Sequence, residues 1–324
     1  MKKDLSIESL RGLAVILVVG GHITGDGLID SAREFYEYMV YSFQYVRLPL
    51  FTVISGFLYG LRPVSEGEFV PFFKGKSRRI LLPLLFVASC EFLAKSLVSE
   101  VNDPQSLENV WRVWVFGYHH YWFLQVILIL FVLMGLLGHF GWRMGWTNWS
   151  FLFLMSGAVY FVFPATGLSL SVFSLGASTY LLPFFIFGIG LAQHSERLLQ
   201  RKALVGWCGI LLLAVIYQQA AWFTDLVTIE GRRPLIGFFL ALSACAVLFK
   251  FRVVIPGLAI VGSYAYSIYL FQGFGTSLGR RIITDVGPHT YFVLLVLFTL
   301  IFGMAVEIVG RRIPFVRTPL LGLK

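Results

Sequence analysis

The chain has 324 residues, of which 57% are hydrophobic and only 13% are charged. This composition excludes a soluble globular domain, in which about a quarter of the residues are charged. The formal net charge of +9 would suit a nucleic-acid-binding protein, but basic residues gathered on cytoplasmic loops explain it as a topology signal. The composition therefore predicts an all-α, polytopic transmembrane helical bundle with no nucleic-acid partner.

Ten apolar segments can be drawn along the chain, which predicts about ten spans. If the N-terminus is inside the cell, the cytoplasmic segments hold 18 of the 26 Lys and Arg residues, so we expect both termini to be cytoplasmic. We expect one membrane domain over residues 1–324, a first helix that is retained, and no appended soluble domain. The fifth and sixth segments are the weakest. The segments are 5–24, 44–61, 79–98, 120–137, 149–163, 180–194, 203–222, 234–249, 259–274 and 290–310.

The first segment carries two ionisable residues, Arg11 and His22, which are eleven positions apart. At about 100° per residue this spacing returns to nearly the same helical face, with the two side chains roughly 16 Å apart along the axis. Ionisable groups inside a span are costly, so they face a bundle interior or a wet cavity and are functional candidates. Imidazole can take and return a proton near neutral pH, and a guanidinium can grip a phosphate.

Each of these residues also has a structural explanation. His22 can be a buried histidine bonded to a neighbouring helix, and Arg11 can be an anchor at the cytoplasmic interface. The shared face and the neighbouring glycines favour the functional interpretation for His22. Asp26, one turn further on, can orient the imidazole, although we expect it to be a solvated loop residue.

A basic cluster precedes the third segment, and it contains Lys76, Arg78 and Arg79. Most of this charge is explained as a topology signal. Lys76 and Arg79 would share a helical face if the helix begins early, and with Arg11 they would form a cytoplasmic anion site.

Polar and aromatic side chains in three further segments are candidates for contacts with a substrate. In the second segment Ser55 precedes Gly56, a small pair that also serves helix packing. The other candidates serve equally as interfacial aromatic anchors or packing residues. They are His120, Tyr121 and Trp122 in the fourth segment and Tyr266 and Tyr269 in the ninth.

Metal binding has little support in the sequence. His119 and His120 are adjacent, so their rings diverge on a helix, and no His-Glu-x-x-His or Cys-x-x-Cys pattern occurs. The three cysteines are scattered through apolar segments and form neither a disulfide framework nor a metal site. We therefore predict no metal.

Taken together, these motifs resemble the acyltransferase-3 superfamily, multispanning enzymes that O-acylate extracytoplasmic glycans and related acceptors. Arg11 and His22 match a basic residue and a His separated by ten residues in the first span. The other matches are Ser55-Gly56-Phe57, the basic pair Lys76 and Arg79 followed by Pro83, His120-Tyr-Trp122-Phe123-Leu124, and Tyr266-Ser-Ile-Tyr269-Leu-Phe-Gln272.

Two residues depart from the family pattern. Lys76 replaces the first Arg of the basic pair, which keeps the charge but loses the bidentate fork. Gln272 stands where the family often has His, so proton transfer at that position is in doubt. The hydrolase-like domain that is fused to some members is absent, so we expect the membrane domain to act alone, as a homo-oligomer or with a periplasmic partner.

The resemblance implies transfer of an acetyl group from cytoplasmic acetyl-CoA to a hydroxyl of an extracytoplasmic polysaccharide or glycan, in the cytoplasmic (inner) membrane of a bacterium. In this interpretation His22 is the general base, and Arg11, Lys76, Arg78 and Arg79 hold the CoA phosphates. The acceptor lies against Ser55, His120, Tyr121, Trp122, Tyr266 and Tyr269.

Two other classes of protein remain open. A transporter or flippase for an anionic or lipid-linked solute would also place Arg and His on one interior helix face, although no internal repeat is evident. A non-catalytic membrane subunit would use the same charges for topology and packing alone. Only the enzyme predicts CoA binding and loss of the thioester.

Overall fold

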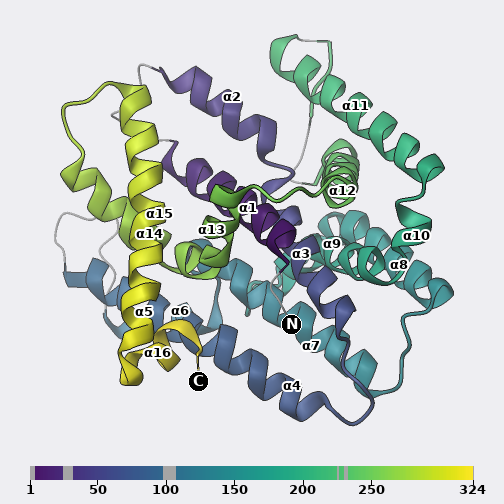
Figure 1. Cartoon of the computed structure of the whole chain (residues 1–324), viewed down its shortest axis with the longest axis horizontal. Helices are drawn as coiled ribbons and strands as arrows, with labels where there is room; N and C mark the ends of the chain where they lie inside the picture. Colours follow the sequence, from purple (N-terminus) through teal and green to yellow (C-terminus); the bar gives the residue numbers. More distant parts are fainter. Residues whose placement is uncertain (1–3, 25–31, 98–106, 225, 230–232, 324) are drawn as a thin grey trace. The chain divides into compact units, whose positions relative to one another are not determined.

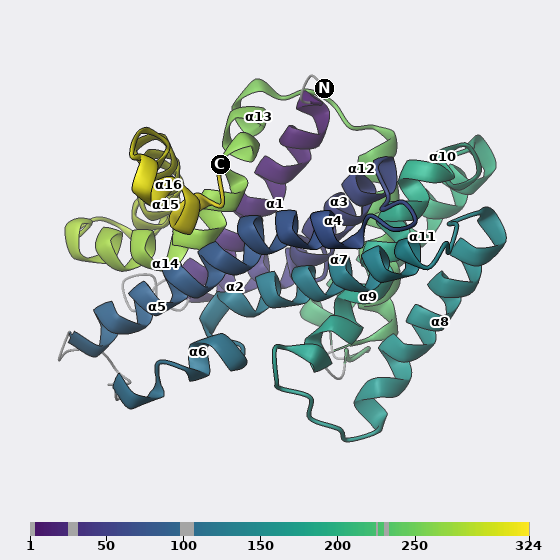
Figure 2. The ribbon, with the colours of Figure 1, turned by 90° about the horizontal axis from the view of Figure 1, so that it is seen from below.

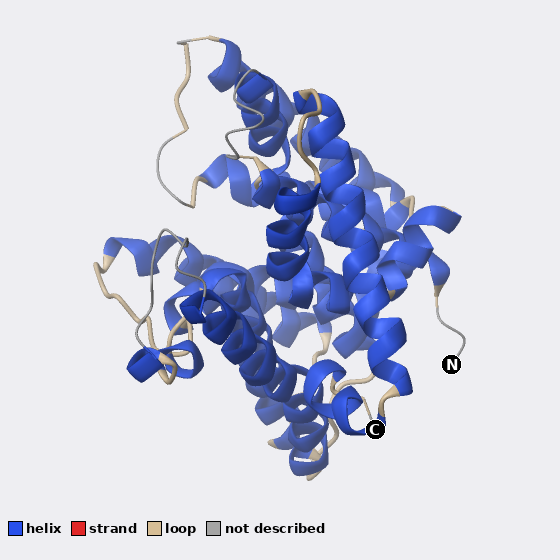
Figure 3. Ribbon diagram, turned by 90° about the vertical axis from the view of Figure 1, so that its left-hand side faces the viewer, coloured by secondary structure: helices blue, strands red, loops and turns tan. Residues whose placement is uncertain are grey.

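The computed structural model of the protein describes residues 4–24, 32–97, 107–224, 226–229 and 233–323. Within these ranges the elements are helices joined by loops, and no strand occurs (Figure 3). One isolated bridge pairs Phe116 with Val172. The predicted fold class, an all-α polytopic helical bundle, is confirmed.

Six helices in the described part of the chain are long and apolar enough to cross a membrane. The fifth and sixth predicted segments correspond to helices of 20 and 19 residues, longer than the sequence indicated. Polar side chains are accommodated in these helices by hydrogen bonds to the backbone of the preceding turn. For example, the Ser178 hydroxyl donates to the Leu175 carbonyl at 2.6 Å. The six are α1 (Leu5–Ile23), α7 with the turn before it (His119–His139), α8 (Trp146–Ala165), α9 (Leu175–Gln193), α11 (Arg201–Phe223) and α15 (Pro288–Arg312).

Large apolar side chains point outward from these helices. On α11, Leu212, Leu213 and Ile216 are exposed to 61%, 68% and 55%. Exposure of such an apolar patch to water is unfavourable, whereas contact with lipid chains is not. The chain is an integral membrane protein.

The helices form two compact units, each built from two stretches of chain. The first unit comprises Met1–Leu61 and Phe184–Met304, and the second comprises Arg62–Pro183 and Ala305–Lys324. A single membrane domain over residues 1–324 stays a prediction. Besides the helices above, the first unit contains α2 (Arg33–Phe43), α3 (Arg47–Leu61), α10 (Ser195–Leu198), α12 (Leu235–Lys250), α13 (Pro256–Ser263) and α14 (Ala265–Ile282), and the second contains α4 (Phe69–Lys76), α5 (Leu82–Leu97), α6 (Arg112–Val115) and α16 (Pro314–Leu321).

The start of α1 is fixed by the side chain of Asp4. Its carboxylate accepts hydrogen bonds from the Ser6 backbone N–H at 3.0 Å and from the Ser6 hydroxyl at 2.6 Å. Such a cap satisfies donors that the first helical turn leaves without partners. The Ser6 hydroxyl bond holds the pKa of Asp4 below its usual range.

Glycines bring α1 and α13 into backbone contact in the first unit, and Figures 1 and 2 show the two helices side by side. A Cβ atom at Gly12 of α1 would lie 2.0 Å from the Leu258 carbonyl oxygen, and one at Gly262 of α13 would lie 1.8 Å from the Glu8 carbonyl oxygen. Small residues permit this close approach, on which helix association in lipid depends.

The ninth predicted span, 259–274, is wrong as a single helix. The structure ends α13 at Ser263 and begins α14 at Ala265. Tyr264 between them has φ −108° and ψ 6°, outside the helical region. The apolar pattern continues through this break, so hydrophobicity alone did not reveal it.

The contact between α1 and α13 can be tested by adding one methyl group. We expect Gly262→Ala to destabilise the protein by about 1–3 kcal/mol, because the new Cβ would meet a carbonyl oxygen that belongs to a packed backbone. The measurement is the thermal unfolding of the purified protein in detergent.

The matched control is Gly209→Ala in α11, where a Cβ would meet nothing within 4 Å. This variant should be neutral or stabilising, because Ala is the better helix former by about 1 kcal/mol. Equal effects of the two substitutions would contradict the proposed backbone contact.

Candidate functional site

Arg11 and His22 lie on one unbroken helix, α1, so the predicted helical spacing holds between them. His22 is exposed and occupies the last turn of α1. Arg11 is one-third exposed. Asp26, considered as a partner for His22, lies outside the described residues.

Arg11 forms an ion pair that the sequence analysis missed. Its Nη1 donates to the Oε1 of Glu8 at 3.0 Å, and the Glu8 side chain is only 6% exposed. The second carboxylate oxygen of Glu8 is buried and accepts no hydrogen bond from the described residues. A buried carboxylate is costly unless a cation faces it, so Arg11 has a structural role as well as any role in binding.

Ser55 lies in α3, which packs on α1 in the same unit. Its hydroxyl donates to the Phe51 carbonyl of its own helix at 2.9 Å. The adjacent Gly56 faces the backbone of α9, because a Cβ there would lie 2.0 Å from the Phe185 carbonyl oxygen. The Ser-Gly pair therefore has the packing role that the sequence analysis gave as its alternative.

Polar groups of three α14 residues are buried in the first unit. Tyr269 is 4% exposed and Gln272 is 2% exposed. The hydroxyl of Tyr266 and both polar atoms of the Gln272 amide are buried without a hydrogen-bond partner among the described residues. Such groups cost about 1–3 kcal/mol each, so they mark a place where a polar ligand would gain binding energy.

The basic cluster belongs to the second unit, and the helix does begin early, at Phe69. A π-helical turn over Ser77–Leu81 joins α4 to α5. This turn is wider than an α-helical one, and the shared face of Lys76 and Arg79 stays a prediction.

The three cations of this cluster that are predicted to hold the CoA phosphates have different surroundings. The Lys76 ammonium lies 3.3 Å from the centre of the Phe131 ring, a cation–π contact. The Nε of Arg78 donates to the Gly322 carbonyl at 3.3 Å. Arg79 is exposed, so of these three cations it is the one best placed to meet a soluble anion.

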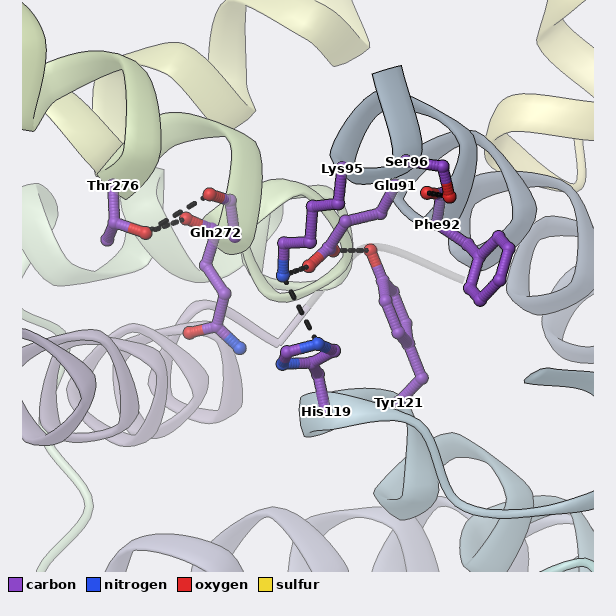
Figure 4. Close-up of polar contacts among 9 residues, drawn as sticks. Glu91, Phe92, Lys95, Ser96, His119, Tyr121, Gln272 and Thr276 are labelled. Carbon is purple, nitrogen blue, oxygen red and sulfur yellow. Dashed lines mark hydrogen bonds and ion pairs between the residues drawn. The ribbon is translucent and has the colours of Figure 1, made fainter. Parts of the chain in front are cut away.

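A buried polar network surrounds Glu91 of α5 in the second unit (Figure 4). Glu91 is 3% exposed. Its carboxylate accepts from the Lys95 ammonium at 2.7 Å and from the Tyr121 hydroxyl at 2.6 Å. The same ammonium lies 3.2 Å from the Nε2 of His119, a residue held at φ +41°. We call Glu91, Lys95, His119 and Tyr121 the Glu91 network.

The Glu91 network fixes two residues that the sequence marked as candidates. Tyr121 is 1% exposed, and its ring stacks parallel to that of Tyr118. The next residue along, Trp122, begins α7 and is half-buried. His120 is 8% exposed, and its ring lies against that of Tyr121.

The sequence signal for this network was a Glu and a Lys four residues apart in an apolar segment. That spacing places both side chains on one helical face, and intramembrane charges are rare enough to indicate a site. Within the described residues, no group of three or more His, Cys, Asp or Glu side chains is arranged to hold a metal ion.

The fold and these ion pairs define a class: a multispanning membrane protein with ionisable side chains held inside apolar helices. A family model described as an acyltransferase domain matches residues 4–308. The chain belongs to this acyltransferase family.

One curated protein in the comparison is nodulation protein NolL of Sinorhizobium fredii (strain NBRC 101917 / NGR234). The two are 27% identical over 213 residues, which covers 63% of this chain and 54% of NolL. The chain thus spans about half the length of that relative. No solved structure matches the chain.

We expect the loss of a buried ion pair in the Glu91 network to lower the free energy of unfolding more than the loss of an exposed ion pair. Glu91→Gln should lower the free energy of unfolding by about 2–3 kcal/mol, because it leaves the partly buried Lys95 ammonium without its counter-charge. Thermal unfolding in detergent measures the effect.

The control is Glu37→Gln, which breaks the exposed pair with Arg33, where N and O are 2.9 Å apart. Exposed pairs contribute about 0–1 kcal/mol, so little change is expected. If Glu91→Gln were as harmless as its control, the network would not stabilise the second unit.

Proposed function

We propose that the protein transfers an acetyl group from cytoplasmic acetyl-CoA to a hydroxyl of an extracytoplasmic polysaccharide or glycan. The observation that carries this proposal is the position of Arg11 and His22 on a single unbroken helix in a chain that belongs to an acyltransferase family. The proposed setting is the inner membrane of a bacterium, with both chain termini in the cytoplasm.

On the donor side, Arg11, Lys76, Arg78 and Arg79 hold the CoA phosphates in this proposal. Arg11 has five N–H donors, of which Glu8 takes one, so others are left for an anion. The exposure of Arg79 supports a direct contact, whereas the contacts of Lys76 and Arg78 suit a role in shaping the site and its positive potential.

The proposed chemistry is general base catalysis by His22. The neutral imidazole takes the proton of the acceptor hydroxyl, and the oxygen attacks the thioester carbonyl. The tetrahedral intermediate then releases the CoA thiolate, which takes the proton back from the imidazolium. The exposure of His22 at the end of α1 supports access by a substrate.

On the acceptor side, we place the glycan against Ser55, His120, Trp122, Tyr266 and Tyr269. Tyr121 acts through its hydrogen bond to Glu91 and its stacking on Tyr118. Gln272 joins this group because its buried amide offers one donor group and one acceptor to a ligand. A separate periplasmic protein or a second copy of the chain completes the transfer if the membrane domain does not act alone.

A transporter or flippase for an anionic or lipid-linked solute is the competing function. It would use the same ionisable residues as a substrate path, but it would consume no thioester. The family membership favours the enzyme.

Substitution of His22 tests the proposed base. We expect His22→Ala to abolish acylation while expression and folding stay normal, because the side chain is exposed and contributes little to the core. The measurement is base-labile acetate released from the cell envelope of the source strain that carries the variant as its single copy. Normal acetate from a well-expressed variant would exclude His22 as the base.

Gln272→Leu distinguishes a ligand contact from a packing role. Leu has a similar size and removes a buried amide without partners, so stability should stay equal or rise. If the amide binds the substrate, acetylation falls at least tenfold despite that stability. Full activity in Gln272→Leu would show that the amide does not contact the substrate.

A further inference from the structure

A cavity of about 270 Å³ lies beside the Glu91 network, entirely within the second unit. Its lining comes from α5, from the turn before α6, from α6 and from the segment that leads to α7. The volume is below the roughly 300–1,000 Å³ of pockets that hold drug-sized ligands, so it suits a group about the size of one sugar residue.

The lining of this cavity combines aromatic faces with polar groups. Phe92, Phe116 and Tyr118 supply rings, while Arg112 and Asn109 supply a guanidinium and an amide. Aromatic faces carry negative potential and attract the C–H groups of a pyranose ring. An amide donates to and accepts from hydroxyls, and a guanidinium matches a carboxylate in a two-bond fork.

The electrostatics of the cavity favour an anion. Arg112 is exposed, and its guanidinium carbon lies 5.9 Å from the centre of the Phe116 ring. The Lys95 ammonium lies 5.8 Å from the centre of the Tyr118 ring. Among the described residues that line the cavity, none is acidic. The charges of Glu91 and Lys95, which pair with each other nearby, cancel, so Arg112 supplies the positive charge of the cavity.

The backbone around the cavity is held in place before any ligand arrives. The Phe116 carbonyl accepts from the Gln125 amide at 3.2 Å, and the Gln125 carbonyl oxygen accepts from the Ser174 hydroxyl at 2.6 Å. Gly117 has no room for a side chain, since a Cβ there would lie 2.9 Å from the Cβ of Trp122. Because these contacts fix the backbone, binding costs little ordering entropy.

We infer that this cavity binds a sugar residue that carries a carboxylate, as part of an acidic glycan. The inference rests on the proposed function, because it identifies the acceptor of the acyl group as an acidic glycan. Arg112 is the residue that selects for the negative charge. The binding itself needs neither an acyl donor nor His22.

The test uses two small probes that differ in one group, methyl glucuronoside and methyl glucoside. Binding to the full chain in neutral-lipid nanodiscs is followed by saturation-transfer NMR at low ionic strength, without acetyl-CoA. We expect the acidic probe to bind at least tenfold more tightly than the neutral one. Arg112→Gln should remove that difference, whereas Arg281→Gln, an exposed arginine of the first unit, should preserve it.

Each other outcome has a defined meaning. Equal binding of the two probes, no binding of either, or an undiminished preference in Arg112→Gln would overturn the inference. Full displacement of the acidic probe by an equal concentration of inorganic phosphate would show an anion site without sugar recognition, which also overturns it. A normal preference in a protein that fails to use acetyl-CoA would instead contradict the proposed function and leave the cavity assignment standing.

Discussion

The contact on which the described site depends is the backbone approach of α1 to α13. At Gly12 and at Gly262, a carbonyl oxygen of the other helix occupies the position that a side chain would take. The Ser9 hydroxyl adds a hydrogen bond from the Ile255 backbone N–H at 3.0 Å. This packing fixes the axis of the helix that carries Arg11 and His22, so the spacing of those two residues becomes a rigid property of the protein.

Charged pairs inside apolar helices are the second recurring feature. In the first unit Glu8 faces Arg11, and in the second unit Glu91 faces Lys95; both carboxylate side chains are less than one-tenth exposed. Neither pair is expected to add much stability relative to an apolar pair, because removing two charges from water is expensive. Their presence inside apolar helices is therefore better explained by function, as sites where charge is needed.

The sequence predicted the helical class, the membrane setting and the helix that joins Arg11 to His22, because hydrophobic periodicity and intramembrane charges are local signals. It did not predict α2, whose exposed polar face gives no continuous apolar run. It also missed the break at Tyr264, through which the apolar pattern continues, and the bond from Tyr121 to Glu91, which joins residues thirty positions apart. The assignment of catalytic and binding residues stays a prediction.

The most direct test of the central claim is acetyl-CoA binding to the purified protein in nanodiscs, measured by calorimetry together with thioester loss. The account predicts saturable binding by the native chain, weaker binding by Arg11→Gln, and thioester loss that disappears when His22 is replaced. A folded native protein that neither binds acetyl-CoA nor consumes its thioester would contradict the account and favour a transporter.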